Sequence, residues 1–364
     1  MVSNRKPSLD AARAVALMFV VVTHAALSFM ATPIGWAVQD RSQHLGVDLY
    51  VWIVRAFAMP TFFWLSGYFS RAVLVHGGIA AFARNRGTRI VVPLAIALVP
   101  CSLVVGALWD WGREIAGRAA VADNIPKLEE SEVEIFLGHL WFLYYLLALS
   151  VVGVGIARLV RRVPARLPIL LLPAVLTFGA LAHLGALHTN TPLGFVPDLA
   201  ILTYTGGFFG WGWLVHARPD ELARYGRRLG AAAVVALGSL AIVITTLARG
   251  LTIVEVPPLY AIAASAVFSI AVMVGLLGAC ERYLAKPRPV LRFVSDASYW
   301  FYVVHLPVVV ALQVLLARVA IPGPIKLVAI VSVTTAVCLG VYAIGSRVTR
   351  GRRRTASRII AHQR

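Results

Sequence analysis

The first long apolar run of the chain, residues 9–30, contains three side chains that could do chemistry: Asp10, Arg13 and His24. His24 follows Arg13 by eleven positions, which is a rotation of about 1100° in an α-helix and only about 20° from three full turns. Asp10 and Arg13 are three positions apart and are also neighbours on a helix surface. The three side chains are therefore predicted to lie on one face, with Arg13 and His24 about 16 Å apart along the axis.

Other apolar runs carry imidazole or basic groups at a similar depth. His305 lies about 18 Å into its run, which is directed outward, at the 1.5 Å rise of a helix. Arg55 and His139 fall in the outer halves of the second and fourth runs, which are both directed inward. A second basic group precedes the third run and consists of Arg84, Arg86 and Arg89. Four imidazole or guanidinium side chains, those of His24, Arg55, His139 and His305, are therefore predicted to lie at one level of the membrane.

Each of these side chains also has a structural interpretation. A histidine inside a span can serve only as a hydrogen-bonding group between helices, and Arg55 can extend its guanidinium toward the membrane surface. His139 fits an interfacial position beside Trp141, and the second basic group fits an anchor to anionic lipid. Polar groups inside spans are costly and are functional candidates by default, but depth alone does not name a reaction.

The composition requires that these runs lie in a membrane. Of 364 residues, 59% are hydrophobic and 14% are charged, whereas soluble domains have about 45–50% apolar and about 25% charged residues. This composition excludes a soluble enzyme, a disordered chain and a secreted disulfide scaffold. The three cysteines lie in or beside apolar runs and are interpreted as small buried side chains, not as a disulfide set or a metal site. The formal charge of +18 comes from basic residues spread over many loops, so no nucleic-acid partner is expected.

Ten apolar runs approach the roughly 20 residues that a membrane-spanning helix needs. They cover residues 9–30, 47–69, 90–109, 135–157, 167–187, 199–215, 229–247, 256–278, 293–316 and 325–344. If ten helices alternate from a cytoplasmic N-terminus, 25 of the 34 Lys and Arg residues fall on the inside, seven fall outside, and Arg13 and Arg55 fall within spans. This bias is typical of a protein of the bacterial inner (plasma) membrane.

The predicted fold class is therefore an all-α polytopic membrane protein with about ten transmembrane helices and both termini in the cytoplasm. We expect one transmembrane domain over residues 1–346 and a basic cytoplasmic tail over residues 347–364, in contact with the lipid bilayer. Arg5 and Lys6 precede the first run as they would in a signal peptide, but the polar residues inside that run argue against a cleaved signal. The oligomeric state does not follow from the sequence.

Several segments resemble the acyltransferase 3 family of integral membrane enzymes. That family carries an arginine, ten residues and a histidine on its first helix, as Arg13 and His24 do, and an Arg-x-x-Arg motif before the third helix, as at residues 86–89. Further segments resemble its second-, fourth- and ninth-helix patterns, namely residues 62–69 (FFWLSGYF), 139–143 (HLWFL) and 298–307 (SYWFYVVHLP). Because these segments follow one another in the family's order, the chain is identified as a member over nearly its whole length.

Within the family, the chain most resembles the branch that includes the osmoregulated periplasmic glucan succinyltransferases. Residues 59–69, the HLWFL run and the short length favour this branch. The branch carries an arginine directly before the methionine of its second-helix motif, where this chain has Ala58. Arg55 lies one helical turn earlier and could reach a similar place, so succinyl is the favoured acyl group and acetyl is the alternative.

The resemblance implies an acyl-CoA co-substrate, succinyl-CoA or acetyl-CoA, that binds from the cytoplasm, and no metal. Arg13, Arg86 and Arg89 are expected to hold the nucleotide and pyrophosphate of coenzyme A, because guanidinium groups match phosphate geometry. Asp10 is expected to pair with Arg13, since an unpaired charge at a membrane helix end is disfavoured.

The resemblance also implies a carbohydrate acceptor on the extracytoplasmic side. His24 is then the general base for the acceptor hydroxyl, or is itself transiently acylated. The developing oxyanion needs donors, for which the candidates are His305, Arg55 and Trp141. The remaining substrate contacts are assigned to His139 and Tyr302.

Two other functions fit the same polar groups. One is O-acetylation of another cell-surface polysaccharide or of a lipid-linked sugar. The other is transport or export of an anionic substrate, for which intramembrane His and Arg residues would form the binding site; the sequence shows neither internal repeats nor broken helices. A purely structural membrane protein is disfavoured by the cost of so many polar groups, and no Walker loop, zinc spacing or Gly-x-Ser-x-Gly elbow competes.

Overall fold

The computed structural model describes residues 5–116, 135–159, 168–218, 220–248 and 256–362, without the side chains of residues 348–362. All regular secondary structure in these ranges is helical. The elements are α1 (Pro7–Ala26), η1 (Leu27–Phe29), α2 (Leu45–Arg55), α3 (Ala58–Arg86), η2 (Gly87–Val91), α4 (Val92–Ala116), η4 (Gly138–Leu140), α5 (Trp141–Leu159), α6 (Leu171–Leu184), α7 (Leu199–His216), α8 (Glu221–Arg227), α9 (Leu229–Ala248), α10 (Leu259–Tyr283), α11 (Pro289–Leu316) and α12 (Gly323–His362). Each predicted apolar run coincides with one or more of these helices.

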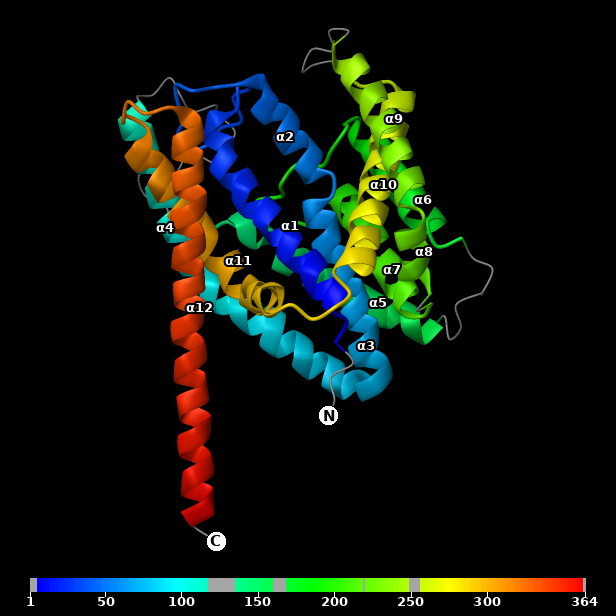
Figure 1. Cartoon of the computed structure of the whole chain (residues 1–364), viewed down its shortest axis with the longest axis vertical. Coiled ribbons are helices and arrows are strands. Elements are labelled where there is room, and N and C mark those ends of the chain that lie inside the picture. Colours follow the sequence, from blue (N-terminus) through cyan, green and yellow to red (C-terminus); the bar gives the residue numbers. More distant parts are fainter. Residues whose placement is uncertain (1–4, 117–134, 160–167, 219, 249–255, 363–364) are drawn as a thin grey trace.

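Seven segments of the described chain are long and apolar enough to cross a membrane. One of them, Leu45–Ile115, contains α2, α3 and α4 together, and α6 is apolar but only 14 residues long. The predicted all-helical membrane architecture is confirmed, whereas the count of ten spans and the side on which the termini lie stay predictions. In Figure 1, α1 begins and α12 ends toward the same, lower end of the molecule.

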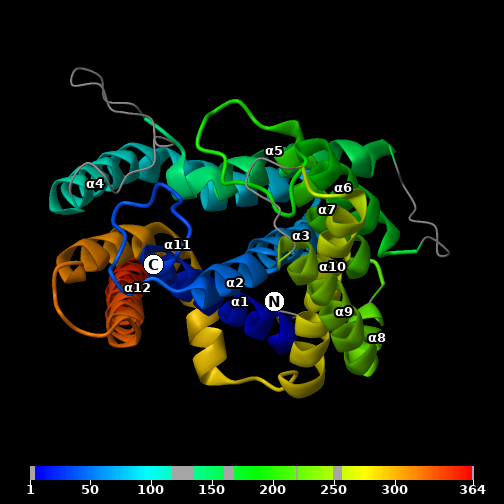
Figure 2. The same cartoon turned by 90° about the horizontal axis from the view of Figure 1, so that it is seen from above.

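Two groups of helices flank a central group of helices. Seen from above, α4, α11 and α12 lie on one side, α5 to α10 lie on the other, and α1, α2 and α3 lie between them (Figure 2). α1 packs against α3, α10, α11 and α12, and most of its residues are buried. Alanines at positions 11, 12, 14 and 16 are among them, and such small side chains allow membrane helices to approach closely. Side chains at the centre of the molecule therefore come from α1.

The second apolar run, predicted as one span, is divided into α2 and α3. The physical reason is Pro60, which has no N–H and whose ring clashes with the carbonyl group four residues earlier, so it favours a kink or a break in the helix at this point. α2 ends at Arg55 and α3 begins at Ala58. The break places Arg55 at a helix end inside the molecule. The sequence analysis did not predict this broken helix.

The lower end of α3 is bent into α4 without a loop. Gly78 has φ 67° and ψ −172°, a conformation that only glycine adopts without strain. The chain then stays helical through Arg86 and through the π-helical η2, which contains Arg89. Pro93 lacks the N–H that a regular α-helix would bond to the carbonyl of Arg89, which favours the π-turn there. The segment predicted as a loop is thus a helical bend that carries both arginines.

α3 and α7 touch at two glycines. A Cβ atom on Gly67 would lie 1.9 Å from the carbonyl oxygen of Phe209, and a Cβ on Gly212 would lie 1.9 Å from that of Trp64. Small residues of this kind let membrane helices pack backbone to backbone. The two glycines therefore set how close α7 lies to α3.

We expect Gly67→Ala to lower the thermal unfolding midpoint of the purified protein in detergent, because a backbone atom cannot move aside as a flexible side chain can. Overpacking of this kind costs about 1–3 kcal/mol. The matched control is Gly238→Ala on α9, where a Cβ would meet nothing within 4 Å, and which should leave the midpoint unchanged or slightly raised. Equal midpoints for the two variants would contradict this account of the α3–α7 contact.

Candidate active site

A cavity of about 1520 Å³ lies in the middle of the molecule. Its walls come from α1, α2, α3, η2, α4, α5, α7, α9 and α11 and from the segment between α6 and α7. Nine of the ten site residues predicted from the sequence line it: Arg13, His24, Arg55, Arg86, Arg89, His139, Trp141, Tyr302 and His305. The same cavity thus reaches both the histidine of α1 and the arginines of the lower end, as the sequence analysis requires.

Three imidazole rings meet in this cavity. His24 Nδ1 lies 3.3 Å from His305 Nε2, and the two ring centroids are 4.9 Å apart. The His139 ring centroid is 5.9 Å from that of His305, and its Nε2 atom is buried without a hydrogen-bond partner among the described residues. The Tyr302 hydroxyl donates to the carbonyl oxygen of His139 at 2.5 Å, so Tyr302 supports His139 instead of offering a free hydroxyl. No group of three or more His, Cys, Asp or Glu side chains in the described ranges could hold a metal ion.

Hydrogen-bond chemistry determines where His24 and His305 carry their protons. His24 Nδ1 is 3.0 Å from the carbonyl oxygen of Val20, and His305 Nδ1 is 2.6 Å from that of Phe301. A carbonyl oxygen can only accept, so each neutral ring has its proton on Nδ1. His305 Nε2 is then an acceptor for His24 Nδ1–H and offers no N–H to an oxyanion. His24 Nε2 keeps a lone pair, which is what a general base requires.

Gln313, which the sequence analysis did not select, holds the backbone at His24. Its side chain is buried, and its Nε2 donates to the carbonyl oxygens of His24 and Ala25 at 2.9 and 3.0 Å. Trp36 Nε1 donates to Gln313 Oε1 at 2.8 Å and so orients the amide, and the Trp36 ring lies 6.2 Å from the His24 ring. A polar residue inside the run 293–316 was the signal that could have found it.

The segment that carries Trp36 is anchored by a buried ion pair. Lys326 Nζ lies 2.5 Å from Asp40 Oδ2, with only 3% and 5% of the two side chains exposed. Asp40 also accepts the backbone N–H of Ser42 at 2.9 Å. The pair ties this segment to the first turn of α12, so α12 supports the site without lining the cavity.

The structure pairs Asp10 with Arg5 and not with Arg13. Arg5 Nε lies 2.5 Å from the Asp10 carboxylate, which also accepts the Ser295 hydroxyl at 3.2 Å. Arg5 precedes the helix in extended backbone and can fold back, whereas the spacing of Asp10 and Arg13 permits a pair without requiring one. The Asp10 hydrogen bond raises the pKa of Arg5 above its usual value. Asp10 does not line the cavity and joins α1 to α11.

The arginines Arg13, Arg86 and Arg89 have no ion pair with a carboxylate in the part of the chain that the structure describes. The Arg13 guanidinium carbon lies 5.1 Å from the ring centroid of Phe69, and that of Arg86 lies 5.0 Å from that of Phe82. Arg86 Nε is buried without a hydrogen-bond partner. Three guanidinium groups that line one cavity and form no ion pair with a described carboxylate suit a polyanion such as a pyrophosphate.

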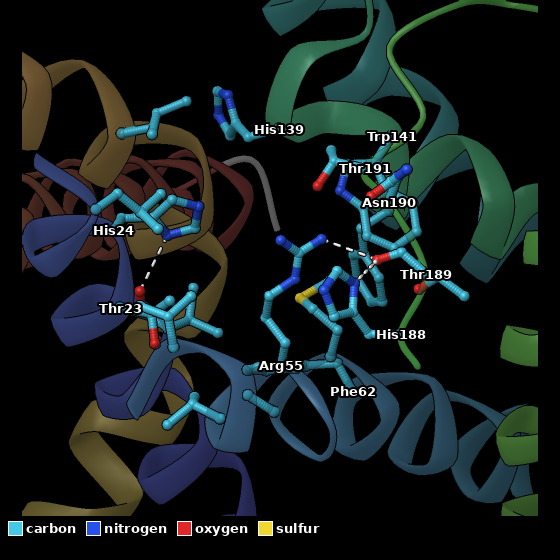
Figure 3. A pocket seen from close by; sticks show the side chains of 18 of the residues that line it. Thr23, His24, Arg55, Phe62, His139, Trp141, His188, Thr189, Asn190 and Thr191 are labelled. Atoms are coloured by element: carbon cyan, nitrogen blue, oxygen red, sulfur yellow. Dashed lines mark hydrogen bonds between the residues drawn. The ribbon is translucent and has the colours of Figure 1, made fainter. Parts of the chain in front are cut away.

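Arg55 and Trp141 lie across the cavity from His24 (Figure 3). Arg55 Nη2 donates to the carbonyl oxygen of Thr189 at 2.9 Å. Thr189 belongs, with His188, to the segment between α6 and α7, and both line the cavity. The sequence analysis did not select this segment because it has no apolar periodicity and lies between two apolar runs.

A family profile described as "Acyltransferase domain" matches residues 6–343. The chain belongs to the acyltransferase 3 family. This confirms the family predicted from the sequence, and it shows that the protein is an acyltransferase of the multi-pass membrane class. The transporter alternative has no support from this match.

The chain is also similar to proteins named "Glucans biosynthesis protein C" from Salmonella paratyphi B (strain ATCC BAA-1250 / SPB7) and Salmonella heidelberg (strain SL476). Each is 26% identical over 152 residues, which cover 42% of this chain and 39% of the relative. The match thus spans well under half the length of these relatives. No solved structure matches the chain.

We expect Lys326→Met to destabilise the protein by about 3–5 kcal/mol, because removing one partner leaves the Asp40 carboxylate buried without a counter-charge. Replacing both partners, Asp40→Leu with Lys326→Met, should recover part of this loss because neither charge remains. Thermal unfolding in detergent of both variants beside the unaltered protein measures the effect. A Lys326→Met midpoint equal to that of the unaltered protein would show that the ion pair does not anchor the segment.

Proposed function

We propose that the protein transfers an acyl group from a cytoplasmic coenzyme A thioester to a hydroxyl group of an extracytoplasmic glucan in the bacterial inner membrane, with succinyl favoured over acetyl. The observation that carries the proposal is the cavity shared by His24 and by Arg13, Arg86 and Arg89, which form no ion pair with a carboxylate of the described residues. The family supports the reaction class, and the names of the relatives support a glucan acceptor.

Coenzyme A binds at the end of the cavity that contains Arg13, Arg86 and Arg89. Its phosphates accept hydrogen bonds from the guanidinium groups, which lie at the lower end of α1 and at the bend between α3 and α4. The pantetheine arm follows the cavity along α1 and brings the thioester to His24, about 16 Å from Arg13 along the helix axis. The excess of Lys and Arg in the cytoplasmic segments of the ten-span arrangement supports binding from the cytoplasm.

The acceptor hydroxyl reaches His24 from the other side of the cavity. His24 Nε2 removes the hydroxyl proton as the oxygen attacks the thioester carbonyl carbon. The tetrahedral intermediate then expels the coenzyme A thiolate, which takes the proton back from His24, so that an ester and free coenzyme A result. The carbonyl of Val20 and the Nε2 atom of His305 hold the ring and stabilise the charge that it carries between the two steps.

We expect His24→Gln to lower kcat by about 10²- to 10⁴-fold, the usual contribution of general-base catalysis, while the protein still accumulates and unfolds at a normal temperature. Release of free coenzyme A thiol by purified protein with an acyl-CoA and a periplasmic glucan measures the rate. His76→Gln is the matched control, because His76 is exposed on α3 and does not line the cavity. Unchanged turnover of the His24 variant would contradict the proposed role of His24 in acyl transfer.

We expect Arg86→Gln and Arg89→Gln to raise the KM for acyl-CoA by about 10- to 100-fold each, the effect of losing a hydrogen bond to a charged group. Arg84→Gln is the control, because Arg84 belongs to the same basic group but does not line the cavity. If Arg84→Gln had the same effect as the other two, general attraction by surface charge would explain binding, and the assigned phosphate contacts would be wrong.

A further inference from the structure

The charges that line the cavity are unbalanced. Five arginines and one carboxylate, Asp48, belong to the lining. Asp48 is occupied by the backbone N–H groups of Ala31 and Thr32 at 2.7 and 2.9 Å, and Arg113 pairs with Asp110 outside the lining. Three of the other four arginines form the coenzyme A end of the cavity. Arg55 is therefore a separate positive charge for which the described residues provide no carboxylate.

Arg55 is surrounded by neutral polar groups. Its Nη2 atom donates to the Thr189 carbonyl, and Figure 3 shows the guanidinium in the cavity beside His188, Asn190 and Thr191. His188 Nδ1 also lies 3.3 Å from the Thr189 carbonyl. Burial, with a smaller effect of the Arg55 charge, lowers the pKa of His188 to about 4, so this ring is neutral at physiological pH. Nothing in this segment compensates the charge of Arg55.

A guanidinium group has five N–H donors. In Arg55, one N–H donates to a protein acceptor, the carbonyl oxygen of Thr189. Arg55 is partly buried, and removing a cation from water is costly unless it is paired, so an anion on a substrate is the expected partner. The phosphates of coenzyme A already have Arg13, Arg86 and Arg89. The planar fork of a guanidinium also fits the two oxygens of a carboxylate.

We infer that Arg55 and the segment 188–191 form a subsite for the terminal carboxylate of a dicarboxylic acyl group whose thioester carbon lies at His24. The inference rests on the proposed function and assigns acyl-group specificity to a particular residue. It replaces the role of oxyanion donor for Arg55, because an oxyanion forms with every acyl group whereas a carboxylate is present in only some. The two roles therefore predict different responses to a change of donor.

The test compares three donors with the purified full-length protein and a glucan acceptor: succinyl-CoA, butyryl-CoA and acetyl-CoA. Butyryl has the same four carbons as succinyl but ends in a methyl group instead of a carboxylate. We expect the unaltered protein to prefer succinyl-CoA to butyryl-CoA in kcat/KM by about 10- to 100-fold, as for one hydrogen-bonded charge pair. Arg55→Gln should abolish this preference by raising the KM for succinyl-CoA, with the rates for the two neutral donors unchanged.

Two further variants sharpen the result. Arg55→Lys keeps the charge without the planar fork, so part of the preference should remain. Arg113→Gln removes another arginine of the cavity lining, one that has a protein partner, and should keep the full preference. Thermal unfolding of each variant separates a change of specificity from loss of the fold, and if Arg55→Gln does not fold, the Lys variant and the preference of the unaltered protein decide.

Three results would overturn the inference and leave acyl transfer in place. They are equal use of succinyl-CoA and butyryl-CoA by the unaltered protein, an equal loss with all three donors in Arg55→Gln, and an Arg55 effect seen only with glucans that carry anionic substituents. The last result would assign the anion to the acceptor. Failure of the unaltered protein to transfer any of the three acyl groups would instead defeat the proposed function itself.

Discussion

A charge buried in a membrane protein needs a partner, and the way each charge finds one divides this molecule into scaffold and site. Asp10 has Arg5, and Asp40 has Lys326, both within 2.5 Å. These pairs join α1 to α11 and the segment 30–44 to α12. Four arginines that line the cavity form no ion pair with a carboxylate of the described residues, and they are the ones available to a substrate. Pairing within the protein thus marks structural charges, and its absence marks binding charges.

The site depends on irregularities of the helices more than on their regular parts. Pro60 ends α2 so that Arg55 faces the cavity, Gly78 bends α3 toward α4, and Pro93 accompanies the π-turn that contains Arg89. His24 comes from the last turn of α1, and Gln313 and His305, both on α11, hold its backbone and its ring. Proline and glycine therefore distribute the polar groups of a largely apolar chain along one cavity.

The arrangement suits a reaction whose two substrates come from opposite sides of a membrane. A thioester bound by its phosphates at one end and a hydroxyl that approaches from the other meet at one imidazole, which needs to move only a proton. His24 is neutral in the tautomer that its hydrogen bonds impose, so it is ready to accept that proton. His24 lines the cavity, so this proton acceptor is available to a substrate that binds there.

The sequence by itself determined the all-helical membrane fold, the family and nine of the polar and aromatic residues that line the cavity. Apolar runs long enough to cross a bilayer allow little but helices, and eleven positions between Arg13 and His24 put them on one face of whichever helix forms. Polar residues inside such runs are so costly that they stand out from the sequence. The family resemblance added Arg86, Arg89 and Trp141, and nine of the ten predicted residues line one cavity.

Only the tertiary structure decided which of these residues act together. Asp10 paired with Arg5 because a residue outside the helix could fold back onto it, a contact that helical spacing does not encode. Gln313 reached His24 across the interface of α11 and α1, and His188 reached Arg55 through a segment without periodicity. Periodicity specifies the face of one helix, whereas the partners of a side chain depend on how several helices pack, and that packing is a property of the whole chain.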